Sequence, residues 1–314
     1  MRRRKPQFKR RRYKASSTRR LSSSDLTVLD FLWTWKVATT PILREVAYKR
    51  KSAWWIYKSL RRLRVEKYIE LLPRGKNLGQ ELWTLTDHGF EIVLMDRDDI
   101  KEYRYRVHAP AHDYLGTCLQ LGDLWQLNVE KNFLTEQMLT SLAPSNFPKG
   151  FRPEDGGHIP DGLTILPGNI NQAVIGYEVD LNLKDPSRYR RTAHYYKYDV
   201  GASLVVWLVK NMWIANKIIE QLAEYSHGGD VNPVLARFAF ILVDDFKQRV
   251  WGAEVVIGPL KGQSIRKMHA NLLQNLGKDN SKIGQKEMRD IFFPKFRSPQ
   301  KTTGYVKGEE ASFD

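Results

Sequence analysis

The chain has 314 residues, 42% of them hydrophobic, which is enough material for two globular domains of ordinary size. A single cysteine, Cys118, excludes an internal disulfide framework and a cysteine-rich zinc site, and no apolar run reaches the roughly 18 residues of a membrane-spanning helix. The formal net charge of +16 favours a polyanionic partner.

The positive charge is concentrated in residues 1–20, which contain eleven Arg or Lys side chains and no acidic one. A segment with so much like charge has little to bury, so residues 1–21 are predicted to form a disordered basic arm that binds a polyanion. We assign DNA contacts to Arg10, Arg11 and Arg12 in this arm. The alternatives are a solubility tail, a membrane-surface patch or an organelle-targeting peptide, but the arm lacks the apolar face of a membrane-lying helix.

Residues 22–98 carry the pattern of a small helical domain that ends in a hairpin. Capping residues, helical spacing of apolar side chains and strand-like alternation indicate its elements. In chain order they are a helix that starts between Ser22 and Asp25, a short helix at 42–47, a third helix capped by Ser52, strands at 68–72 and 81–85, and a helix that opens at Thr86 and Asp87. Three helices followed by a two-stranded hairpin is the order of a winged helix-turn-helix domain, whose third helix can enter the major groove of DNA.

Basic side chains fall at the two places where a winged helix meets DNA. Lys58, Arg61 and Arg62 are on the predicted third helix, and Arg74 and Lys76 are in the turn between the two strands. We therefore predict that these residues contact double-stranded DNA, where basic side chains can reach phosphates. The alternative is a protein-binding winged helix whose charged face lies in solvent.

Residues 99–298 are predicted to form a second domain with a mixed sheet flanked by helices. Helical spacing begins at His112 after a connector, and a Pro- and Gly-rich loop covers residues 144–157. The elements expected after the loop are strands at 162–166 and 173–183, a helix at 188–198, a strand at 203–209, a helix at 211–225, and strands at 236–243 and 250–257. Residues 299–314 are expected to be a flexible tail, and residues 259–314 receive no functional role.

Three acidic residues flank the turn of the predicted hairpin. The turn is centred between residues 169 and 170, and Asp161 and Glu178 lie equally far from that centre, so a symmetric hairpin places them opposite each other. Asp180, two residues beyond Glu178, points to the same face. Converging carboxylates repel one another, and Mg²⁺ or Mn²⁺ would offset that repulsion and could orient a phosphodiester. The alternative is an amphipathic hairpin whose acidic face lies in solvent.

A basic and aromatic helix is predicted directly after the hairpin. It contains Arg188 and Arg191 among several tyrosines, and we expect these two arginines to contact DNA phosphates beside the acidic edge. The alternative is a helix with a solvated charged face whose tyrosines pack on the sheet.

The stretch His158-Ile159-Pro160-Asp161-Gly162, the hairpin, the sequence Glu178-Val179-Asp180 and the basic helix together resemble the plasmid replication-relaxation family. The resemblance spans roughly residues 22–215. It implies an α+β / α/β two-domain fold, in which an amino-terminal winged helix-turn-helix precedes a restriction-endonuclease-like (PD-(D/E)xK) mixed sheet flanked by helices. Members of this family include relaxases that nick one DNA strand at a transfer origin.

The resemblance also implies residue roles. Asp161 and Glu178 match metal-binding acids, and Asp180 stands where a restriction nuclease has lysine. Lys184 would lie roughly 13 Å beyond Asp180 on an extended strand, so Lys197 is the better candidate for charge stabilisation. The implied metal ligands are Asp161, Glu178, Asp180 and Glu136. The implied catalytic residues are Asp161, Glu178, Asp180, Lys197 and Tyr196, with Tyr195 and Tyr198 as alternative nucleophiles, while His112 and His158 are weaker candidates.

These observations lead to a predicted Mg²⁺- or Mn²⁺-dependent nicking endonuclease or relaxase of a plasmid or other mobile element. Its expected partners are double-stranded DNA, single-stranded DNA after nicking, a second copy in a homodimer, and accessory mobilisation or replication proteins, with no membrane. The expected location is the prokaryotic cytoplasm, in association with the nucleoid or a plasmid. The alternatives are a non-catalytic initiator, accessory factor or regulator with a degenerate nuclease-like domain, and a structural nucleoprotein.

Overall fold

The protein is described by a computed structural model over residues 21–49, 51–72, 81–100, 105–107, 109–127, 133–142, 147, 151, 157–166, 173–225 and 235–276. Within these residues it is a mixed α+β structure with a two-stranded sheet and a six-stranded sheet. None of the described helices combines the length and the apolar character needed to cross a membrane.

The amino-terminal elements follow the predicted order. They are α1 (Ser23–Trp35), α2 (Thr40–Ala47), α3 (Ala53–Val65), the antiparallel strands β1 (Ile69–Leu72) and β2 (Leu82–Leu85), and α4 (Asp87–Asp96). The side chains of Ser22, Ser52 and Thr86 accept hydrogen bonds from backbone N–H groups in the first turns of α1, α3 and α4. These three helices therefore begin where their capping residues predicted, because the caps satisfy N–H groups that have no partner inside the helix.

The larger sheet has the strand order β3-β4-β5-β6-β7-β8. Its strands are β3 (Phe133–Thr135), β4 (Gly162–Leu166), β5 (Ala173–Asp180), β6 (Leu204–Val209), β7 (Phe238–Leu242) and β8 (Val255–Ile257). Strands β5, β6 and β7 run parallel, and the other neighbours are antiparallel. Every residue of β5 and β6 is buried, as is typical of parallel strands that are covered on both faces.

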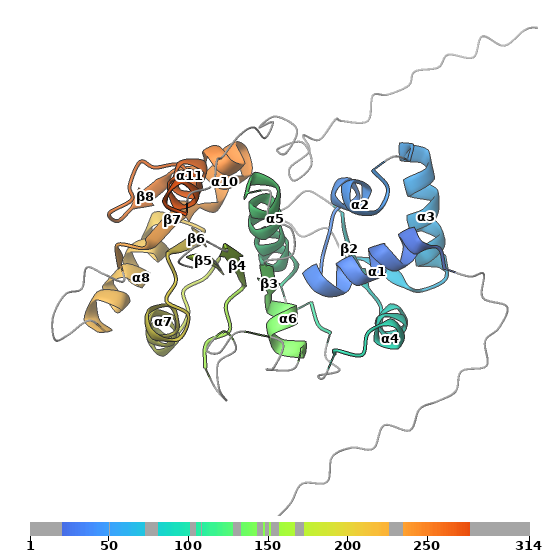
Figure 1. The fold of residues 1–314 in the computed structure, drawn as a ribbon, viewed down its shortest axis with the longest axis horizontal. Coiled ribbons are helices and arrows are strands. Elements are labelled where there is room, and N and C mark those ends of the chain that lie inside the picture. The colour runs from blue at the N-terminus through green and yellow to red at the C-terminus, as the bar shows by residue number, and fades with distance from the viewer. Residues whose placement is uncertain are drawn as a thin grey trace, which may run out of the picture.

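Helices cover both faces of this sheet. They are α5 (Pro110–Leu127), α6 (Glu136–Ser141), α7 (Pro186–His194), the π-helical turn η2 (Tyr195–Asp199), α8 (Met212–Tyr225), α10 (Val243–Arg249), the 3-10 turn η3 (Val250–Gly252) and α11 (Ile265–Asn275). A Cβ atom added at Gly162 would overlap Gln120 of α5, whereas one added at Gly176 would overlap the ring of Tyr196 in η2. Gly162 pairs with Tyr177, so Gly162 and Gly176 face opposite sides, and α5 and η2 therefore cover opposite faces. Figure 1 shows α5 between the helices α1 to α4 and the sheet.

Several boundaries differ from the predicted ones. The strand predicted at 173–183 ends at Asp180, because Asp185 caps α7 and Pro186 opens it, so the chain leaves the sheet before that point. The strand predicted at 250–257 is the turn η3 followed by the short β8, and the strand predicted to reach residue 243 gives way there to α10. Strand β3 was not predicted, and α11 lies in a region to which the sequence assigned no role.

Candidate functional site

The pairing of β4 with β5 follows the register that a symmetric turn predicted. Gly162 pairs with Tyr177, and Asp161 lies directly before β4, where its carboxylate accepts from the backbone N–H of Val179 and contacts His112 of α5, whereas Glu178 contacts Tyr196 of η2. Glu178 and Asp180 are only 2% and 1% exposed. The alternative in which this acidic face lies in solvent is therefore wrong.

Two side chains hold the carboxylate of Glu178. Nε2 of His158 lies 2.6 Å from Oε1 of Glu178, and the hydroxyl of Tyr196 donates to the same oxygen at 2.7 Å. Oγ1 of Thr192 lies 3.2 Å from Nδ1 of His158, which fixes the orientation of the imidazole ring. Burial raises the pKa of Glu178, and the nearby His158 opposes that increase.

Asp180 forms an ion pair with Lys184, the lysine that was expected to lie too far away on an extended strand. Nζ of Lys184 lies 2.5 Å from Oδ1 of Asp180, and the indole N–H of Trp207 donates to Oδ2 at 2.9 Å. The expectation that Lys184 lies too far away is wrong, because the strand ends at Asp180 and the chain turns back before α7. Burial raises the pKa of Asp180, and Lys184 opposes the increase.

Asp161 lies directly before β4. Its Oδ2 accepts one hydrogen bond and forms one ion pair. The backbone N–H of Val179 donates to it at 2.6 Å, and Nε2 of His112 on α5 lies 3.3 Å away. Burial alone would raise the pKa of Asp161, but His112, Lys184 and the Val179 amide lower it to about 2. Burial alone would lower the pKa of His112, but the carboxylates of Asp161 and Asp113 raise it to about 10.

Each of the three hairpin acids therefore has a basic side chain of its own as a partner. His112, His158 and Lys184 contact carboxylate oxygens that a divalent cation would need as ligands. Within the described part of the chain, no three His, Cys, Asp or Glu side chains are grouped so that they could hold one metal ion. In this arrangement the donor set does not fit the Mg²⁺ or Mn²⁺ that the sequence suggested.

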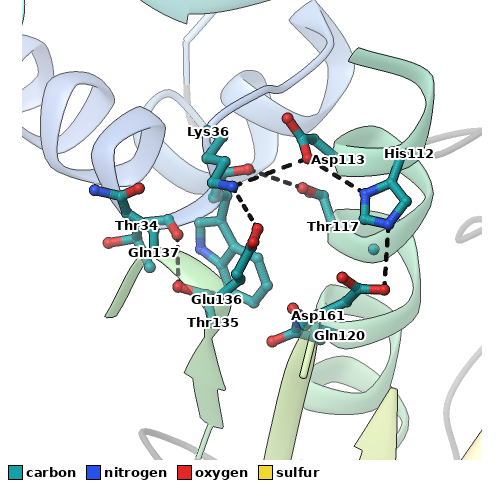
Figure 2. Close-up of a pocket in the computed structure, with 12 residues that line it drawn as sticks. Thr34, Lys36, His112, Asp113, Thr117, Gln120, Thr135, Glu136, Gln137 and Asp161 are labelled. Carbon is teal, nitrogen blue, oxygen red and sulfur yellow. Dashed lines mark hydrogen bonds and ion pairs between the residues drawn. The ribbon is translucent and has the colours of Figure 1, made fainter. Parts of the chain in front are cut away.

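Glu136, the fourth acid of the predicted metal set, meets a lysine in an adjoining pocket. The ammonium of Lys36 contacts the carboxylate of Glu136 and lies 4.0 Å from Oδ1 of Asp113, and Nδ1 of His112 lies 3.4 Å from that same oxygen. Figure 2 shows these side chains and Asp161 lining the pocket between the end of α1, helix α5 and the start of α6. A chain of alternating charges thus connects Glu136 to Asp161.

The carboxyl-terminal end of α1 is tied to the second half of the chain by hydroxyl groups. Thr135 donates to the carbonyl oxygen of Thr34 at 2.7 Å, and Thr117 donates to that of Trp35 at 3.1 Å. The last carbonyls of a helix have no partner inside it, so Thr135 satisfies the carbonyl of Thr34, while Thr117 adds a second donor to the carbonyl of Trp35, which also accepts from the backbone N–H of Val37 at 2.7 Å. The end of α1 is therefore fixed against β3 and α5.

Lys36, the residue after α1, adopts a strained backbone conformation. Its φ of 63° is left-handed, which is uncommon for a residue that carries a Cβ atom. The hydroxyls of Thr84 and Tyr105 donate to its carbonyl oxygen at 2.9 and 2.6 Å and hold this conformation. Strain of this kind persists where the surroundings determine the geometry, and here the geometry directs the ammonium into the pocket.

The His112–Asp161 ion pair predicts how stability depends on pH. The pKa of His112 rises from 6.5 to about 10 on folding, so its contribution is complete below pH 6.5 and is lost as the pH rises to about 10. The pKa of Asp161 falls from 3.8 to about 2, so its contribution requires a pH above 3.8. We expect His112→Gln to lower the free energy of unfolding by about 1–3 kcal/mol between these limits, and by much less near pH 10.

Chemical denaturation at a series of pH values measures this difference. His194→Gln is the matched control, because the His194 side chain is 54% exposed, and it should change stability by less than about 0.5 kcal/mol at every pH. A loss at His112 that does not vary with pH would contradict the assignment of a charged imidazole.

Tyr196, the predicted nucleophile, is buried, whereas Lys197, the residue predicted to stabilise charge beside it, is exposed. Tyr196 is 2% exposed, and burial followed by the nearby Glu178 raises the pKa of its hydroxyl well above the usual value. Lys197 is exposed, with Nζ 4.8 Å from the ring centroid of the exposed Tyr198. Lys184, rather than Lys197, acts on the pKa values of Asp161, Glu178 and Asp180.

Tyr195, one of the two alternative nucleophiles, is buried, and its hydroxyl donates to the carbonyl oxygen of Phe151 at 2.8 Å. The two arginines of α7 that were predicted to contact DNA, Arg188 and Arg191, are both exposed.

Of the three predicted DNA contacts on α3, two are exposed, and the third, Arg62, is partly buried in an ion pair. Lys58 and Arg61 are exposed. Arg62 lies 2.6 Å from Oδ2 of Asp25, a residue that is 1% exposed and belongs to the amino-terminal cap of α1. Arg62 thus joins α3 to α1, and its contact with DNA remains a prediction.

Several predicted DNA contacts and segments lie outside the described residues. The contacts are Arg10, Arg11, Arg12, Arg74 and Lys76. The segments are residues 1–20 of the arm, both predicted hairpin turns, most of the loop at 144–157 and the predicted tail at 299–314.

Sequence reasoning missed Lys36 and undervalued Lys184. The contact of Lys36 with Glu136 joins residues 100 positions apart, so local spacing carries no signal for it. For Lys184 a signal existed, because Asp185 and Pro186 mark a helix start that ends the strand early. His112 and His158 were singled out, and both prove to be partners of the hairpin acids.

Comparisons with protein-family models, with curated proteins and with solved structures found no match to this chain.

Proposed function

We propose that this protein binds double-stranded DNA and that α1 to α3 with the β1–β2 hairpin form a winged helix-turn-helix domain. The observation that carries this proposal is the exposed face of α3, which presents Lys58, Arg61 and Arg64, while the helix contains no acidic residue. The third helix of a winged helix is the one that enters the major groove. The basic segment at residues 1–20 has the same sign of charge and would extend the contact along the phosphate backbone.

We propose further that the protein acts as a non-catalytic initiator, accessory factor or regulator of a plasmid or other mobile element. In that role the six-stranded sheet is a nuclease-like domain whose acids serve structure. The pairing of Asp161, Glu178 and Asp180 with His112, His158 and Lys184 supports this role, since these side chains already contact the carboxylate oxygens that a metal ion would need. Membership of the plasmid replication-relaxation family is part of the proposal and rests on the residues that resemble it.

A metal-dependent nicking activity is the second candidate function. It is favoured by the contact of Asp161 with the backbone N–H of Val179, between the two acids of β5, and by the ammonium of Lys184 beside Asp180. Two acids and a lysine are the side-chain types of a PD-(D/E)xK site, although here the lysine comes from a later position in the chain. A cation would have to displace histidine side chains from these acids before it could bind.

Fluorescence anisotropy with labelled duplex DNA tests the DNA-binding proposal. The double variant Lys58→Glu/Arg61→Glu is expected to weaken binding by about 10-fold or more, because repulsion of phosphates replaces attraction on α3. The matched control is Lys261→Glu/Lys267→Glu, which makes the same change in net charge near α11, far from α3 in Figure 1, and should change affinity by less than about 3-fold. Equal losses in both variants would show that only net charge matters and would exclude α3 as the contact surface.

The same preparations distinguish the two candidate roles. Supercoiled DNA is incubated with the wild-type protein and with Asp161→Ala, in Mg²⁺ or Mn²⁺ and with EDTA as the control. The non-catalytic role predicts no nicked product under any condition, with duplex binding retained by both proteins. Nicked product that disappears with EDTA and in Asp161→Ala would establish the second candidate instead.

A further inference from the structure

The exposed face of α3 carries aromatic side chains as well as cations. Trp54, Trp55 and Tyr57 are 66%, 48% and 62% exposed. The opposite face of the same helix packs in the core, where Ile56 and Leu60 are buried. Large aromatic side chains that remain in solvent on a well-packed helix indicate a contact surface.

Lysine side chains lie over the two indole rings. Nζ of Lys58 is 4.8 Å from the ring centroid of Trp54, and Nζ of Lys51 is 5.5 Å from that of Trp55. Residues 54, 58 and 61 are spaced by four and three positions, so Trp54, Lys58 and Arg61 follow one stripe of the helix. Aromatic rings and cations are thus interleaved on one exposed surface.

We infer that this surface binds unpaired bases of single-stranded DNA, with Trp54 and Trp55 as stacking platforms and Lys51, Lys58 and Arg61 as phosphate contacts. Proteins that bind single strands combine these two features, because every base has a face that can stack on an aromatic ring while the backbone follows positive charge. The inference rests on the proposed function and adds unpaired bases to its ligand, as in DNA where a duplex opens into single strands.

Duplex DNA alone does not account for the two indole rings. In a duplex the base faces are stacked on one another, and the grooves present only polar edges and methyl groups. An indole ring gains full contact on a base only when that base is unpaired. A second copy of this chain fits the surface poorly, because it would bring the cations of two α3 helices face to face.

The test compares an oligothymidylate of about 20 nucleotides with a duplex of equal length, both labelled, at one salt concentration. Trp54→Ala/Trp55→Ala is expected to weaken binding of the single strand by about 10-fold or more and binding of the duplex by less than about 3-fold. Trp213→Ala is the matched control, because Trp213 on α8 is also exposed, at 57%, and both affinities should be unchanged. Quenching of tryptophan emission by oligothymidylate should persist in the control and decrease in the double variant.

The outcomes separate this inference from the proposed function. If the wild-type protein binds neither probe, the proposed function itself fails. If it binds the duplex, but the single strand binds equally well to the double variant, only the inference fails. An equal loss for both probes would also overturn it, as would an oligouridylate bound more than about 10-fold tighter than oligothymidylate. Sedimentation that shows a wild-type dimer and a monomeric double variant would assign the surface to self-association.

Discussion

Lys36→Met is expected to lower the free energy of unfolding by about 2–4 kcal/mol, measured by equilibrium denaturation at neutral pH. The side chain of Lys36 is 10% exposed and faces Glu136 and Asp113, so its removal leaves the partly buried Glu136 without its cation and the buried Asp113 with one cation fewer. The free energy of unfolding should fall by less than it would if a fully buried ion pair were broken. Glu136 remains 35% exposed to water, and His112 still contacts Asp113.

Lys67→Met is the matched control for this prediction. Lys67 also has a left-handed backbone, with φ of 60°, but its side chain is exposed. Lysine and methionine both carry a Cβ atom, so the backbone strain is unchanged at either site, and the control should lose less than about 0.5 kcal/mol. If the two variants lose the same stability, the ion pairs of Lys36 do not stabilise the fold, and its conformation requires another cause.

Deletion of residues 2–20 is expected to weaken duplex binding by about 100-fold near 0.1 M salt and to flatten its salt dependence. The segment contains eleven basic residues, and each phosphate that one of them neutralises releases condensed counterions. Log affinity is plotted against log salt between about 50 and about 200 mM, and the difference in slope gives the number of phosphates that the arm neutralises.

A chain with residues 2–20 in shuffled order controls for sequence. Phosphate contacts carry no base information, so the shuffled arm should retain both the affinity and the slope of the wild type. A deletion that leaves affinity and slope unchanged would contradict the assignment of the arm to DNA. A shuffled arm that behaves like the deletion would show that particular residues, rather than charge, carry the contact.

Local patterns in the sequence predicted much of this architecture. Ser52 and Thr86 marked helix starts that the structure confirms, and of the four candidate caps from Ser22 to Asp25 it is Ser22 that caps α1, because a capping side chain acts on N–H groups only two or three residues away. The strict two-residue period of β-strands also predicted the register in which β4 pairs with β5, with Gly162 opposite Tyr177.

Only the tertiary structure decided how the charges are satisfied. Glu136 was grouped with the hairpin acids because residue types and their order could not exclude it, yet its cation is Lys36, 100 positions earlier in the chain. His112 reaches Asp161 from α5, and His158 reaches Glu178 across the end of the sheet. The physical reason is that helix capping and strand alternation act over a few residues, whereas an ion pair depends on which segments pack together, and burial then determines how strongly each charge requires its partner.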